Sequence, residues 1–118
     1  MRCRSVGSWA ATVRWRDCAG CLPHRTVESL PPDGVAIQLS LADAKSPAWV
    51  KPMRWPPRLR PVVNSFEGLP TRIGVVQLIG RLRGFEAYLW VFYGRPRPSE
   101  RQVALARAEL RAARLPRR

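Results

Sequence analysis

All three cysteines and the single histidine of the chain lie within its first 24 residues. Cys18 and Cys21 form a C-x-x-C pair, His24 follows three residues later, and Cys3 lies close to the start. Thiolate sulfur and imidazole nitrogen are the ligands of closed tetrahedral zinc sites. One hypothesis is therefore a zinc-stabilised N-terminal module with Cys3, Cys18, Cys21 and His24 as ligands. Apart from zinc, we expect no cofactor.

Other chemistries of a C-x-x-C pair fit this stretch less well. A thioredoxin-like redox pair sits where a strand meets a helix, and no helical pattern follows Pro23. Haem attachment requires a histidine directly after the second cysteine, whereas Leu22 and Pro23 intervene here. A lipid-attachment motif requires an aliphatic residue at the position of Cys18 and an apolar run upstream, and this sequence has neither. The remaining alternative is a pair of incidental thiols, or a local disulfide if the protein is exported.

A second candidate site is the segment WVKPMRWPPRLR, residues 49–60, which interleaves tryptophans with basic side chains. Single-strand binding proteins use this mixture for base stacking and phosphate contact. The residues concerned are Trp49, Lys51, Arg54, Trp55, Arg58 and Arg60. The alternative, favoured by the burial tendency of large aromatic residues, is that both tryptophans pack on the core while the arginines stay hydrated.

A third basic feature lies near the C-terminus, where Arg107, Arg111 and Arg114 recur at helical spacing. Such a stripe can lie along phosphates, although a solvated helix face is its more common meaning. Together with residues 49–60 it gives the alternative function of a nucleic-acid-binding protein.

Net charge is consistent with a negatively charged partner. The formal charge is +13, and only two of the 21 basic residues are lysines. This balance favours an anionic partner such as nucleic acid or a component of the cell envelope. An alternative source of the arginine excess is the codon usage of a GC-rich genome.

Catalytic patterns are absent from the sequence. There are eight acidic residues and one histidine, and no P-loop, G-x-S-x-G or H-E-x-x-H motif. We therefore expect a non-enzymatic binding or structural module. No apolar run approaches the roughly 20 residues needed to span a bilayer, so no transmembrane segment is expected.

The elements that would position these residues begin with two alternating patterns. Residues 8–16 place Trp9, Ala11, Val13 and Trp15 on one face of a possible strand. Residues 17–34 are interpreted as a loop ending in the turn PPDG. A strand follows, with Val35, Ile37, Leu39 and Leu41 directed inward and Ala36, Gln38 and Ser40 outward.

The second half of the chain predicts a hairpin and a helix. Residues 72–80 and 85–94 are apolar on both faces, which indicates central strands, and the short RLRG connection makes them an antiparallel hairpin. Ser99 and Gln102 form a capping box for a C-terminal helix, with Val103, Ala106, Leu110 and Ala113 on its apolar face. The fold class is α+β, a small antiparallel sheet with a C-terminal helix packed on one face. We expect a poorly defined segment over 1–28, a single domain over 29–115 and a tail over 116–118.

From LPPDGVAIQL onward the chain resembles a group of small, uncharacterised actinobacterial domain proteins. The likeness covers about residues 29–115 and rests on LPPDG, WPPRLRP, RGFEAYLWVFYG and the turn to a Ser-capped helix. The resemblance implies no catalytic residues, and it implies an envelope or extracellular setting because members often carry a signal or anchor ahead of the domain. As written, the start of this sequence departs from that pattern and predicts a cytoplasmic protein, whereas a different start codon would restore the envelope or extracellular setting.

Overall fold

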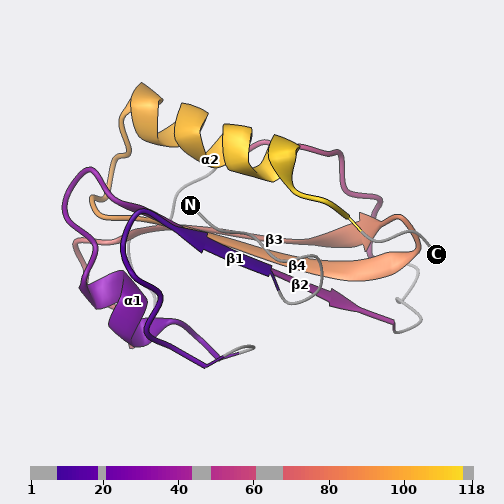
Figure 1. The fold of residues 1–118 in the computed structure, drawn as a ribbon. Coiled ribbons are helices and arrows are strands. Elements are labelled where there is room, and N and C mark those ends of the chain that lie inside the picture. The colour runs from indigo at the N-terminus through magenta and orange to yellow at the C-terminus, as the bar shows by residue number, and fades with distance from the viewer. Residues whose placement is uncertain (1–7, 19–20, 44–48, 61–67, 116–118) are drawn as a thin grey trace.

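The computed structural model describes residues 8–18, 21–43, 49–60 and 68–115. Within them, four strands form one antiparallel sheet in the order β1-β2-β4-β3 (Figure 1). The strands are β1 (Ser8–Ala11), β2 (Val35–Ala42), β3 (Gly74–Leu82) and β4 (Phe85–Tyr93). The helices are α1 (His24–Glu28) and α2 (Glu100–Ala112), which lie on opposite faces of the sheet. The predicted α+β class, with the C-terminal helix on one face of an antiparallel sheet, is confirmed.

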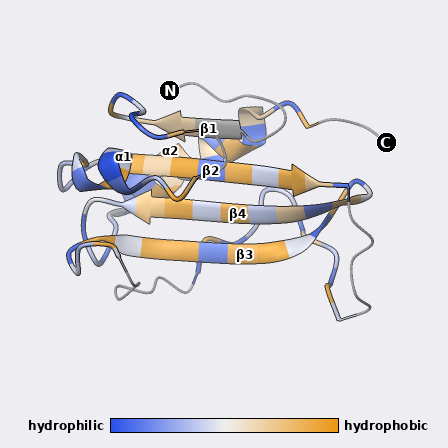
Figure 2. Cartoon of the chain, turned by 90° about the horizontal axis from the view of Figure 1, so that it is seen from below, coloured by the Kyte–Doolittle hydropathy of each residue, from blue (hydrophilic) through white to orange (hydrophobic). Residues whose placement is uncertain are grey.

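The two central strands are β2 and β4, and both of their faces contain buried residues. Their register pairs Val35 with Tyr93 and Ile37 with Val91. Apolar residues run along β2, β3 and β4 (Figure 2). The expectation that Ala36 and Gln38 point outward to solvent is wrong, because they are 0% and 8% exposed. A second layer covers that face.

The β3–β4 hairpin turns through only two residues. Arg83 and Gly84 both have positive φ, 50° and 85°. This combination is that of a type I′ turn, whose twist matches the right-handed twist of the strands it joins. The predicted hairpin is confirmed, although β3 extends two residues closer to the turn than the predicted strand, as far as Leu82. The expectation that both of its strands are central is wrong for β3, which is the edge strand of the order β1-β2-β4-β3.

Helix α2 covers the first face of the sheet. Its N-terminus carries the predicted capping box, in which the Ser99 hydroxyl accepts from the Gln102 N–H and the Gln102 side chain accepts from the Ser99 N–H. Ala106 and Leu110 are buried against a core of sheet residues, with Val103 packed beside them. The predicted apolar face is therefore the face that packs. The core on this side consists mainly of Val35, Ile37, Leu39, Val76, Leu89, Val91 and Tyr93.

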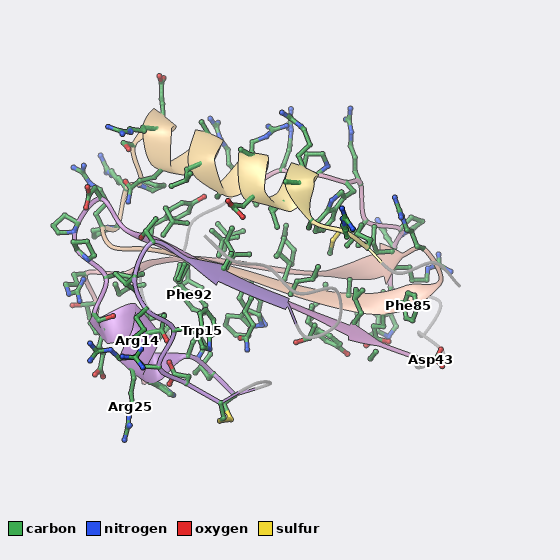
Figure 3. All side chains as sticks on the ribbon, viewed as in Figure 1. Arg14, Trp15, Arg25, Asp43, Phe85 and Phe92 are labelled. Carbon is green, nitrogen blue, oxygen red and sulfur yellow. A yellow bond between two sulfur atoms is a disulfide. The ribbon has the colours of Figure 1, made fainter. Side chains whose placement is uncertain are left out.

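The other face of the sheet is covered at one end by α1 and the chain around it. Val27 and Leu30 form a second core with Ala36 and Phe92, and Trp15 packs against it (Figure 3). The interpretation of residues 17–34 as a loop is wrong at α1. Residues 8–28, expected to be poorly defined, contribute the edge strand β1 and this helix, so elements of the sheet begin well before residue 29. Residues 116–118 lie outside the described ranges.

Candidate anion-binding groove

The segment 49–60 is fixed to the fold at three points. The Met53 N–H donates to the Arg81 carbonyl, and the Arg81 N–H donates to the Lys51 carbonyl. Further along, the Trp55 indole N–H donates to the Leu110 carbonyl of α2 at 2.9 Å. Leu59 is then 3% exposed within the α2-side core. The segment therefore runs from the edge of β3 to the side of α2.

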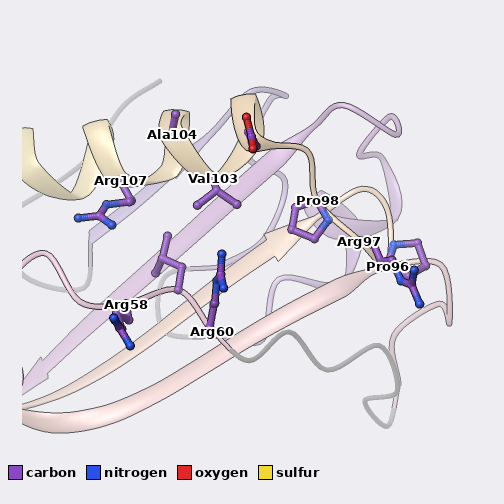
Figure 4. A pocket seen from close by; sticks show the side chains of 10 residues that line it. Arg58, Arg60, Pro96, Arg97, Pro98, Val103, Ala104 and Arg107 are labelled. Atoms are coloured by element: carbon purple, nitrogen blue, oxygen red, sulfur yellow. The ribbon is translucent and has the colours of Figure 1, made fainter.

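A groove lies between this segment, the turn before α2, and α2 itself (Figure 4). Its volume is about 1170 Å³. Four of its ten lining residues are arginines, and the remainder are mainly apolar. The lining residues are Arg58, Leu59, Arg60, Pro96, Arg97, Pro98, Glu100, Val103, Ala104 and Arg107.

Local structure explains why the arginines reach the groove. Burial alternates along the segment, with Leu59 buried between the exposed Arg58 and Arg60, as in an extended chain packed on one side. Arg107 lies one helical turn beyond Val103, on the same side of α2. Arg97 lies between two prolines, where the chain bends ahead of the Ser99 cap. Figure 4 shows Arg97 at the opposite end of the groove from Arg58 and Arg107.

The groove is strongly cationic. The described residues of its lining supply four guanidinium groups and one carboxylate, that of Glu100. Within the described part of the chain, no ion pair joins these arginines to an acidic side chain. Exposed guanidinium groups that lack a carboxylate partner keep their donor forks available for an external anion.

The structure brings together only part of the predicted nucleic-acid site. Arg58, Arg60 and Arg107 line the groove, whereas Lys51, Arg54, Arg111 and Arg114 are exposed outside its lining. The predicted packing of both tryptophans is wrong for Trp49, which is 73% exposed, and right for Trp55, which packs against the α2-side core.

Sequence reasoning missed Arg97 as a groove residue. The only local signal is RPRP, residues 95–98, in which Arg97 stands between two prolines. Its place in the same groove as Arg60 depends on how the segment 49–60 packs along α2, and that packing is not visible in a local pattern.

The four residues of the zinc hypothesis have different surroundings. Cys18 and Cys21 are joined by a disulfide, the arrangement that the sequence left as an alternative. His24 forms a hydrogen bond of 2.9 Å between its Nδ1 and the Gly68 carbonyl oxygen. Cys3 lies outside the described residues. Among the residues with described positions, no group of three or more His, Cys, Asp or Glu side chains could hold a metal ion. The zinc site stays a hypothesis that requires the reduced cysteines.

The helices in the described ranges include none that is long and apolar enough to cross a membrane. Comparison of the chain with protein-family models, curated proteins and solved structures finds no match. The groove and its arginines are therefore the basis for a functional proposal.

Proposed function

We propose that the protein is a non-enzymatic binding module that takes an anionic partner in the groove beside α2. The observation that carries the proposal is the presence of four arginines, from three separate segments, in the lining of one groove. The resemblance to small actinobacterial proteins, which we retain as part of the proposal, is compatible with it because that group implies no catalytic residues.

The charge and the shape of the groove favour an anion-binding site over a merely hydrated surface. Arginine side chains spread over a surface repel one another and are screened by salt within about 8–10 Å. Here apolar side chains, among them Leu59 and Val103, line the groove together with the arginines. A partly desolvated anion would interact with the arginines more strongly than it would in open water.

The test compares arginines inside and outside the groove. We would measure binding of a labelled oligothymidylate and of a labelled polyglutamate by fluorescence anisotropy at low salt. Arg58→Gln, Arg60→Gln and Arg107→Gln should each weaken binding of at least one of the two. Arg101→Gln is the matched control, because Arg101 is an exposed arginine of α2 that does not line the groove. Equal losses at Arg101 and in the groove, or no binding of either polyanion, would refute the proposal.

A second candidate function rests on the exposure of Trp49. An exposed indole near Lys51 and Arg54 could stack on a base, as in the nucleic-acid interface predicted from the sequence. Support for this interface is weaker because Trp55, its second proposed stacking residue, packs against α2. If Trp49→Ala weakens binding of the oligothymidylate several-fold while the groove variants do not, the interface lies at Trp49.

A further inference from the structure

We infer that the occupant of the groove is the phosphodiester backbone of a single nucleic-acid strand, bound through its phosphates and independently of its bases. The inference rests on the proposed function and names the ligand class of the same groove. It differs from the sequence-based hypothesis, in which stacking on Trp49 and Trp55 contributes.

The placement of the arginines favours an extended ligand. Arg58 and Arg60 are two residues apart, so in an extended segment their Cα atoms lie at most about 7 Å apart. Arg107 faces them from α2, and Arg97 lies at the far end of the groove (Figure 4). Since the guanidinium groups are distributed along the groove and do not converge on one point, they suit several charges in a row. The volume of about 1170 Å³ also exceeds the roughly 300–1,000 Å³ of pockets for small molecules.

The chemistry of the donors favours phosphate. Arginine presents a planar fork of N–H donors that matches phosphate oxygens in two parallel hydrogen bonds. A phosphodiester strand carries one charge per nucleotide on the backbone itself. An acidic peptide carries its charges on flexible side chains, and fixing each glutamate costs up to about 2 kcal/mol of rotamer entropy. The strand therefore loses less entropy for each contact.

The groove lining also indicates that the bases are not recognised. None of the described residues that line it is aromatic and able to stack on a base. The described lining also holds no asparagine or glutamine, the side chains that pair bidentately with adenine, and Glu100 is its acidic side chain. Leu59, Val103 and the two prolines offer apolar contact only. The bases are therefore expected to point away from the groove.

The experiment measures three labelled probes against the full chain by anisotropy. These are an oligothymidylate, an abasic oligomer with the same number of phosphates, and a polyglutamate of equal charge. We expect the two phosphodiester probes to bind within about twofold of each other, because stacking, where present, contributes about 1–3 kcal/mol per base, or a factor of five or more. Polyglutamate should bind at least tenfold more weakly.

Salt and variants complete the test. Four phosphate contacts predict that log affinity falls with log salt with a slope of about −3, at about −0.7 per contact on single strands. Each of Arg58→Gln, Arg60→Gln, Arg97→Gln and Arg107→Gln should reduce the magnitude of the slope by about 0.7, and Arg101→Gln and Trp49→Ala should leave it unchanged. All these side chains are exposed, so the melting temperature of each variant should stay close to that of the parent.

The outcomes separate this inference from the proposed function. If polyglutamate binds as tightly as oligothymidylate and the groove variants weaken both, the groove is a general anion site and the phosphodiester inference is wrong. If the abasic oligomer binds more weakly than oligothymidylate, or if Trp49→Ala binds oligothymidylate more weakly than the parent protein does, the bases are recognised. If none of the groove variants changes any binding, both proposals fail.

Discussion

At the scale of single residues, Gln102 is the side chain that joins α2 to the turn before β2. It is 2% exposed, and its Nε2 donates to the carbonyl oxygens of Pro32 and Gly34 at 3.0 Å each. Gln102→Glu keeps the acceptor for the Ser99 N–H but replaces this donor by an anionic oxygen that faces two carbonyl oxygens. We expect a loss of about 3 kcal/mol or more at pH 7, since a buried charge would be left unpaired.

Acid should partly rescue this variant, because a protonated carboxyl group can again donate one hydrogen bond. Denaturant unfolding at pH 7 and pH 4, compared with the parent at both, measures the rescue. Gln77→Glu is the control, since Gln77 is exposed on β3 and should change stability by no more than about 0.5 kcal/mol. Equal stability of Gln102→Glu and Gln77→Glu at pH 7 would contradict the role of the Gln102 amide.

Tyr93 presents the opposite situation, a buried polar atom without a partner. The side chain is 0% exposed, and its hydroxyl has no hydrogen-bond partner in the described part of the structure. Tyr93→Phe should therefore raise the free energy of unfolding by up to about 1–2 kcal/mol or leave it unchanged. Tyr88→Phe is the comparison, because the Tyr88 hydroxyl donates to Glu86. A loss of more than about 1 kcal/mol in Tyr93→Phe would show that the hydroxyl is satisfied.

The same residue should affect stability in alkali. Burial raises the pKa of Tyr93 to about 12, above the usual tyrosine value of about 10. Because the folded state holds this proton more tightly than the unfolded chain, the contribution to stability is complete below pH 10 and is lost as the pH rises towards 12. Tyr93→Phe should reduce that loss, as followed by urea unfolding between pH 9 and pH 12.

At the scale of elements, α1 depends on a side chain outside the helix. The Asp17 carboxylate accepts hydrogen bonds from the Arg25 N–H, the Thr26 N–H and the Thr26 hydroxyl. Burial acts to raise the pKa of Asp17, but the hydrogen bonds from Thr26 and Arg25, with the charge of His24, lower it below the usual value. The folded state therefore binds this proton less tightly than the unfolded chain does.

The lowered pKa of Asp17 predicts how the stability of the protein changes as the pH falls. The contribution of Asp17 to stability is present above its unfolded pKa of about 3.9 and is lost as the pH falls through the lower folded value. Asp17→Asn should lower stability at pH 7 by up to about 1 kcal/mol and show a smaller further loss below pH 4. Thermal melts from pH 7 to pH 2 test this, with Asp33→Asn, on an exposed turn, as control. Parallel acid curves for the parent and Asp17→Asn would contradict it.

The contrast between α1 and α2 shows which elements could be predicted from the sequence. For α2, both partners of the capping box lie within four residues and the apolar face repeats over three turns, so a local pattern is sufficient. α1 has five residues, too few to be stable alone, and its capping carboxylate comes from Asp17 across the disulfide-bonded stretch. The strand β4 was predicted with two apolar faces and β2 with one, whereas the burial of Ala36 and Gln38 on the second face of β2 requires the packing of α1 and the chain around it.

At the scale of the whole molecule, the candidate groove was predictable only in its parts. Arg58, Arg60 and Arg107 were identified from charge and spacing, yet nothing local places residue 58 beside residue 107. That proximity follows from the hydrogen bonds of the segment 49–60 to Arg81 and Leu110, which are contacts between residues far apart in the sequence. Trp49 was misplaced for the same reason, since the chain is fixed from Lys51 onward while the indole before it is exposed.

The whole-molecule charge raises a final question, whether binding depends on the groove or only on the net charge of +13. Glu100→Gln and Glu28→Gln each raise the net charge by one, but only Glu100 lines the groove. Glu28 is exposed in α1, on the opposite face of the sheet. If the groove binds the anion, Glu100→Gln should increase affinity for oligothymidylate about two- to fivefold by removing a repulsion of about 0.5–1 kcal/mol, while Glu28→Gln leaves affinity unchanged.

Glu100→Gln should also destabilise α2 by about 0.3–1 kcal/mol, because a carboxylate in the first turn interacts favourably with the helix dipole. Higher affinity combined with lower stability cannot arise from improved folding, so that pair of changes would identify the groove as the binding site, whereas equal gains in affinity from both variants would assign binding to net charge alone.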